Sequence, residues 1–106
     1  MVTAHDTPGQ IPGQTPGQFL DGYAEILADA ATTGRRLTRD ELDSRRELGA
    51  QAAASGHGWR VLVREHLATA RTAWPRTASP DDVLPVIEQA MDAFADGYER
   101  AQRLVI

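Results

Sequence analysis

The sequence predicts an all-α fold, a four-helix antiparallel bundle with a long C-terminal helix. Apolar residues recur at intervals of three and four in four segments of the 106-residue chain, which is the period of an α-helix. No segment alternates apolar and polar residues as a half-buried strand does. Short connections containing glycine or proline separate the four segments, and such connections favour antiparallel neighbours.

The composition is that of one small domain, and it excludes several functional classes. Apolar residues make up 42% of the chain, which is enough for one hydrophobic core. The chain has no cysteine, so it forms neither a disulfide scaffold nor a thiolate metal site. A net charge of -4 is the wrong sign for binding phosphate, and no apolar run approaches the ~20 residues that span a bilayer. We therefore expect a cytoplasmic protein without direct nucleic-acid or membrane contacts.

Residues 1–18 are predicted to form a flexible leader. Pro-Gly-Gln occurs three times between Pro8 and Gln18, at a period of four residues. Proline removes backbone donors and glycine raises the entropy of the unfolded chain, so this stretch favours a mobile tail. A proline-rich docking peptide is the alternative, although the PxxP spacing typical of such peptides is absent. The helical domain is then expected over residues 19–106.

The first two helices have recognisable boundaries in the sequence. The first is expected to begin at Phe19, where one apolar face starts, and to end at Thr33-Gly34. The second is expected to begin at Arg39, because Thr38 and Glu41 have the spacing of a capping box. Each boundary rests on a local signal and not on a tertiary contact.

The body of the second helix carries little apolar bulk. Gly49 and the alanines that follow it allow neighbouring helices to approach closely instead of filling space. At its start, Leu37 and Leu42 have the spacing of a hydrophobic staple. Glu41 and Arg45 lie four residues apart, which predicts a favourable ion pair along the helix.

Proline residues delimit the third and fourth helices. Apolar residues at helical spacing predict a third helix over residues 59–74, which Pro75 ends. For the fourth helix, Ser79 is the predicted N-cap and Pro80 is the predicted first helical residue. Pro85 lies in the second turn of that helix and removes one backbone hydrogen bond, which predicts a bend in the first turn.

The apolar stripe of the fourth helix continues to the last residues and predicts a dimer. Neighbouring helices of ~15 residues are too short to cover such a stripe at ~1.5 Å per residue, so we expect a parallel homodimer seam. No C-cap signal follows the stripe, and we expect the chain to be the N-terminal module of a larger protein with a downstream output domain. The expected dimer or partner interface consists of Ile87, Met91, Phe94, Tyr98, Ala101 and Val105, with Arg45 and Arg46 as further partner contacts.

The sequence contains no pattern typical of a catalytic, cofactor or metal site, and we expect none of the three. His66 is the one ionisable group within the apolar stripe of the third helix. A hydrogen-bonded core histidine is the simpler interpretation, and a pH or ligand switch is the alternative. A second functional hypothesis is a small-molecule sensor with a pocket between the third and fourth helices. That pocket would be lined by Trp59, His66, Phe94 and Tyr98.

Residues of the second and third predicted helices carry a resemblance to known regulators. They are Leu37-Thr38 through Leu48-Gly49, then Gly56, Trp59, Leu62-Val63, Leu67 to Ala70 and Trp74-Pro75. Over roughly residues 19–106 the chain resembles the helical N-terminal region of actinobacterial PucR-type transcriptional regulators. It is similar also to the N-terminal helical module of Rsb-type stress-response phosphatases.

The resemblance implies a regulatory function. Such modules are expected to dimerise or to receive a partner's signal, and to pass it through the last helix to a C-terminal output domain. The leading hypothesis is therefore a non-catalytic dimerisation and protein-interaction module that acts in transcription regulation or signal transduction. Its expected partners are a second copy of the chain, the downstream output domain and a protein partner.

Overall fold

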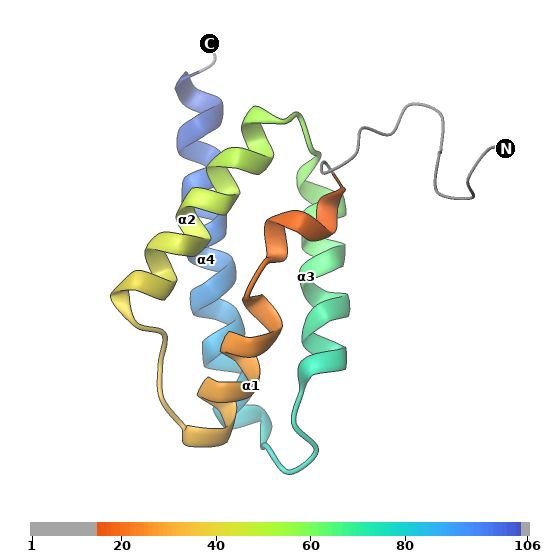
Figure 1. The fold of residues 1–106 in the computed structure, drawn as a ribbon, viewed down its shortest axis with the longest axis vertical. Coiled ribbons are helices and arrows are strands. Elements are labelled where there is room, and N and C mark those ends of the chain that lie inside the picture. Colours follow the sequence, from red (N-terminus) through yellow and green to blue (C-terminus); the bar gives the residue numbers. More distant parts are fainter. Residues whose placement is uncertain (1–14, 105–106) are drawn as a thin grey trace, which may run out of the picture.

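The structure, a computed structural model, describes residues 15–104 and is all-helical in that range (Figure 1). A short 3-10 helix precedes four α-helices. The order is η1 (Pro16–Leu20), α1 (Tyr23–Thr33), α2 (Arg39–Ala54), α3 (Trp59–Ala73) and α4 (Pro80–Leu104). The predicted all-α class and the four predicted helices are confirmed.

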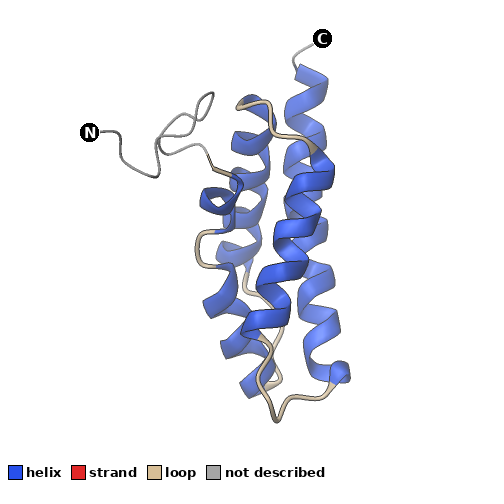
Figure 2. Ribbon diagram, turned by 90° about the vertical axis from the view of Figure 1, so that its right-hand side faces the viewer, coloured by secondary structure: helices blue, strands red, loops and turns tan. Residues whose placement is uncertain are grey.

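The longest helix, α4, packs most extensively against α2 and also contacts α1. In turn, α1 packs against α3, and η1 lies against both α2 and α3 (Figures 1 and 2). The chain runs in opposite directions along α3 and α4. The backbones of these two helices lie farther apart than those of α2 and α4, and the rings of Trp59 and His66 on α3 meet those of Phe94 and Tyr98 on α4.

The hydrophobic core consists of two clusters, one toward each end of the molecule. The first cluster lies around α1 and the beginning of α4, and the second lies where α2 ends and α3 begins. The first contains Leu20, Tyr23, Leu27, Ala30, Leu37, Ala70, Val86 and Ala90, and the second contains Phe19, Ala52, Leu62, Phe94 and Tyr98.

The predicted first helix is split in two, and its expected start at Phe19 is wrong. Phe19 belongs to η1, and α1 begins only at Tyr23. Gly22 separates them with φ of 80°, a left-handed conformation that favours glycine and breaks the helical path. The predicted end is confirmed, because Gly34 caps α1 with φ of 73°. Of the predicted leader, residues 1–14 lie outside the described range, and residues 16–18 belong to η1.

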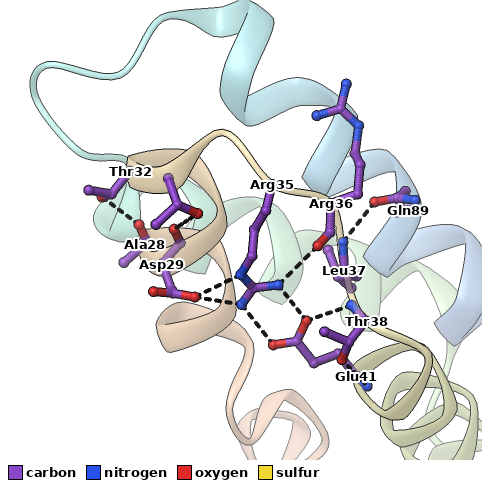
Figure 3. Close-up of polar contacts among 10 residues, drawn as sticks. Ala28, Asp29, Thr32, Arg35, Arg36, Leu37, Thr38, Glu41 and Gln89 are labelled. Atoms are coloured by element: carbon purple, nitrogen blue, oxygen red, sulfur yellow. Dashed lines mark hydrogen bonds and ion pairs between the residues drawn. The ribbon is translucent and has the colours of Figure 1, made fainter.

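The connection from α1 to α2 is held by hydrogen bonds (Figure 3). The predicted capping box is confirmed, because the Glu41 amide donates to Thr38 Oγ1 and Glu41 accepts from the Thr38 amide. The guanidinium of Arg35 donates to Glu41 and Asp29 at 2.6–3.0 Å. This hydrogen bonding from Arg35 lowers the pKa of Glu41 below its usual value.

The predicted ion pair between Glu41 and Arg45 is wrong. Glu41 is engaged by Arg35, which enters from the preceding loop. Arg45 instead turns into the core, where its Nη2 donates to the Asp21 carbonyl. Sequence spacing placed both side chains on one helix face but carried no information about the loop arginine that competes for the carboxylate.

Two glycines bring α2 and α4 into close contact. A Cβ atom built on Gly49 would lie 2.1 Å from the carbonyl oxygen of Phe94. On the facing helix, a Cβ atom on Gly97 would lie 1.9 Å from the carbonyl oxygen of Arg46. Each glycine therefore packs directly against the backbone of the other helix. The role expected of Gly49 is confirmed, and Gly97 is its counterpart on α4.

The remaining boundaries agree with the sequence. The third helix ends at Ala73, two residues before Pro75, and the fourth begins at Pro80 and continues through Pro85. Within residues 15–104, no helix is both long enough and apolar enough to cross a membrane.

Candidate functional site

A groove with aromatic and other apolar side chains lies between α3 and α4. Trp59 spans this space at one end, with its ring centroid 5.2 Å from that of Tyr98 and 6.1 Å from that of Phe94. An open pocket of about 580 Å³ lies there. Its lining residues come from both helices and are Trp59, Ala95, Tyr98, Glu99 and Gln102.

Apolar side chains continue from this pocket along both helices. On α3, Val63 and Leu67 follow Trp59 at intervals of four residues and so lie on the same side of the helix. Leu67 is 49% exposed, although it is a large aliphatic residue. By this helical spacing we define the α3–α4 groove as two rows of residues, its walls: Trp59, Val63 and Leu67 on α3, and Leu84, Ile87, Met91, Ala95 and Tyr98 on α4. Leu84, at the far end, also lines a second open pocket with Arg36 and Pro80.

The α4 wall extends the side of the helix that meets Trp59. Ala95, Met91, Ile87 and Leu84 precede Tyr98 at intervals of three and four residues, the spacing of one helix side. Leu84 is 54% exposed, and Ile87, Met91 and Ala95 are half-buried. The described chain leaves this row partly exposed to solvent.

The two largest residues of the predicted dimer seam, Phe94 and Tyr98, lie inside the protomer. Phe94 is fully buried among the rings of Trp59 and His66. Tyr98 is buried too, and its hydroxyl donates to the His57 carbonyl at 2.7 Å. Phe94 cannot meet a second copy without leaving this core, whereas Tyr98, 7% exposed, also lines the open pocket. The sequence correctly placed both residues on the apolar stripe of α4. This stripe is wide enough that one of its sides faces the core and the other faces the groove.

The other predicted interface residues lie in different environments. Ile87 and Met91 line the groove, and Ala101 is half-buried near the end of α4. Val105 lies outside the described residues. Arg46 is on the surface, where it pairs with Asp43 and Asp96 of the same chain. Its charge is therefore satisfied within the protomer.

The prediction that Arg45 contacts a partner is wrong, because its side chain is only 2% exposed. Its Nη2 also donates to Ser44 Oγ, while Nε and Nη1 have no hydrogen-bond partner among the described residues. Burial lowers its pKa from the usual value. Burial has the opposite effect on the nearby phenol: it raises the pKa of Tyr23 to about 12, and the Arg45 charge partly opposes this rise. These two residues form a polar element of the core and not a surface site.

His66 is a core residue, 1% exposed, and it does not line the pocket that contains Trp59. Its Nδ1 lies 2.7 Å from the Leu62 carbonyl, and its ring makes edge contacts with those of Tyr23 and Phe94. Burial lowers its pKa below 6.5, and the charge of Arg45 acts in the same direction. The neutral imidazole is the form that the fold accommodates.

This burial predicts a pH dependence of stability. The unfolded chain protonates His66 near pH 6.5, whereas the folded chain resists protonation to a lower pH. The stability contributed by the neutral ring is therefore complete above pH 6.5 and is lost progressively as the pH falls toward the lowered pKa. Urea unfolding at several pH values between 8 and 5 measures it. The His66→Phe variant should lose less stability than the wild type over this range, and equal losses would contradict the assignment.

Within residues 15–104, no group of three or more histidine and carboxylate side chains is placed to hold a metal ion. What the arrangement offers chemically is an apolar surface with aromatic residues at one end. The helical period of the sequence placed Ile87, Met91 and Tyr98 of the α4 wall on the predicted stripe. It missed the α3 wall, since Val63 and Leu67 also fit a core stripe and only their exposure distinguishes them.

The comparisons with known proteins leave the family open. The resemblance to PucR-type regulators and Rsb-type phosphatases stays a prediction from the sequence. Searches of protein-family models, of curated proteins and of solved structures gave no match to this chain.

Proposed function

We propose that this chain is a non-catalytic regulatory module, an antiparallel four-helix bundle that dimerises through the α3–α4 groove. In this proposal it acts in the cytoplasm, within a transcriptional regulator or another signalling protein. The observation that carries the proposal is the row of apolar side chains that the described chain leaves exposed. Leu67 and Leu84, on opposite walls, are each about half exposed. Burying a large aliphatic side chain is worth roughly 1.5–3 kcal/mol, which favours a partner for this surface.

The position of α4 suits it to relay a signal. One side of α4 packs into the core, and the adjacent side forms a groove wall, so occupancy of the groove and the position of α4 are linked. Its last turns project past the other helices, as both views show (Figures 1 and 2), and Leu104 is 87% exposed. We propose that a downstream output domain responds to the position of the C-terminal end of α4.

The test is the mass of the chain in solution. Sedimentation equilibrium at tens of micromolar should give twice the 11.5 kDa of one chain. Leu67→Glu should shift the protein toward monomer, because it places a charge in the apolar interface. Val61→Glu is the matched control, since Val61 is 40% exposed on the same helix but lies off the groove wall. A monomeric wild type, or equal effects of the two variants, would rule out dimerisation through this groove.

A small-molecule sensor is the second candidate, favoured by the pocket beside Trp59 and Tyr98. Its volume of about 580 Å³ lies in the usual range for small-ligand sites. A monomeric mass combined with a rise in unfolding temperature on adding indole would favour this function over dimerisation.

A further inference from the structure

Two rows of opposite charge flank the α3–α4 groove. On the α3 side, Arg60, Arg64 and Arg71 are exposed, and on the α4 side, Glu88, Asp92 and Glu99 are exposed. We name them the basic row and the acidic row. Within residues 15–104 none of the six forms an ion pair, whereas Asp96 on α4 pairs with both Arg46 and Arg100. The six charges therefore border the apolar surface without an ion-pair partner among the described residues.

The two rows have matching levels along the groove. Trp59 packs on Tyr98, so the residues that follow them, Arg60 and Glu99, lie near the same end. Because α3 and α4 run in opposite directions, moving eleven residues along α3 to Arg71 corresponds to moving eleven residues back along α4 to Glu88. Each end of the groove thus has a basic group on one side and an acidic group on the other.

From this pattern we infer that the occupant of the groove is a second copy of the chain in a head-to-head arrangement. The inference rests on the proposed dimer and specifies its symmetry. A two-fold axis parallel to the helices keeps every residue at its level and exchanges the two sides of the groove. Arg60 of one copy then faces Glu99 of the other, and Arg71 faces Glu88. Since the interface is symmetric, each such pair forms twice.

The alternative two-fold arrangement is disfavoured by the same charges. In this alternative the two-fold axis lies across the groove, perpendicular to the helices. It turns the second copy head-to-tail, so that α3 faces α3 and α4 faces α4. The basic row would then face a basic row, and the acidic row an acidic row, which is a repulsive arrangement. The head-to-head dimer also brings the exposed ends of both α4 helices to the same end of the assembly, as a relay to paired output domains requires.

Charge reversal tests this inference. Arg60→Glu combined with Arg71→Glu makes both sides of the groove acidic and should weaken dimerisation at least about tenfold, because like charges then face each other at four places. Glu88→Arg combined with Glu99→Arg should do the same with basic charges. Arg39→Glu with Arg100→Glu is the matched control, because both arginines are exposed and lie on the α2 side of the molecule, Arg39 on α2 itself and Arg100 beside Asp96, which pairs with Arg46 of α2. Circular dichroism checks that every variant remains helical.

The variant with all four groove reversals provides the decisive comparison. Its rows are exchanged, so it should regain a homodimer like that of the wild type, although each double reversal alone weakens the dimer. In the head-to-tail arrangement like charges face each other in all four proteins, so neither the weakening nor the recovery would occur. Sedimentation gives the homodimer affinity of each protein. A wild-type dimer that tolerates both double reversals, or a four-fold variant that fails to recover, would overturn the head-to-head arrangement and leave the dimer itself standing. A monomeric wild type would instead overturn the proposed function.

Discussion

Gly97→Ala is expected to lower the free energy of unfolding by about 3 kcal/mol or more. In an ordinary helix this substitution stabilises by up to ~1 kcal/mol, because alanine has the higher helix propensity. Here the new methyl group would lie 1.9 Å from the Arg46 carbonyl oxygen and within 3 Å of two further backbone atoms. Backbone atoms cannot rotate away as a side chain can, so α2 and α4 would have to separate. Urea unfolding followed by circular dichroism measures the change.

Gly17→Ala is the control for this effect. Nothing lies within 4 Å of a Cβ atom at Gly17, and its backbone is not in the left-handed region. Its stability should be equal to that of the wild type or slightly higher. A Gly97→Ala protein as stable as Gly17→Ala would show that α2 and α4 do not cross at this distance.

Arg45→Ala is expected to have the second largest effect, a loss of about 2–5 kcal/mol, as for other large-to-small core substitutions. Arg45 is among the largest fully buried side chains of the described residues, and its removal leaves a cavity. It also leaves the Asp21 carbonyl without its donor. Thermal and urea unfolding of the variant measure the loss.

Arg45→Met separates packing from charge. Methionine keeps most of the aliphatic volume and removes the Nε and Nη1 groups that lack partners. Replacing a buried charge by an apolar group of similar volume is often neutral or stabilising, so this variant should lose much less than Arg45→Ala. Equal losses in the two variants would mean that the guanidinium, and not the volume of the side chain, holds this part of the core.

Local signals in the sequence predicted most of the fold. The capping box at Thr38, the glycine at position 34 and the prolines at positions 75 and 80 act within a few residues, and each boundary they predicted is present. The break at Gly22 was not predicted, because the apolar period continues through it from Phe19 to Tyr23. A single glycine inside a helical pattern does not reveal whether its φ is positive.

The candidate site was predicted in part, because helical period identifies a face but not what covers it. The sequence placed Phe94 and Met91 on one stripe of α4, yet Phe94 is buried by its own chain and Met91 lines the groove. Arg45 illustrates the same limit, since its burial depends on a loop carbonyl 24 residues earlier in the chain. Both distinctions are set by tertiary contacts that no local pattern encodes.

Two copies are proposed to join through the α3–α4 groove, and an isotope-filtered NOE spectrum tests this dimer most directly. In a dimer of one ¹³C-labelled and one unlabelled chain, such a spectrum reports only contacts between copies. We expect signals between the Leu67 methyl groups of one copy and the Met91 methyl group of the other. Intermolecular signals confined to other surfaces, or none in a sample shown to be dimeric, would contradict the claim.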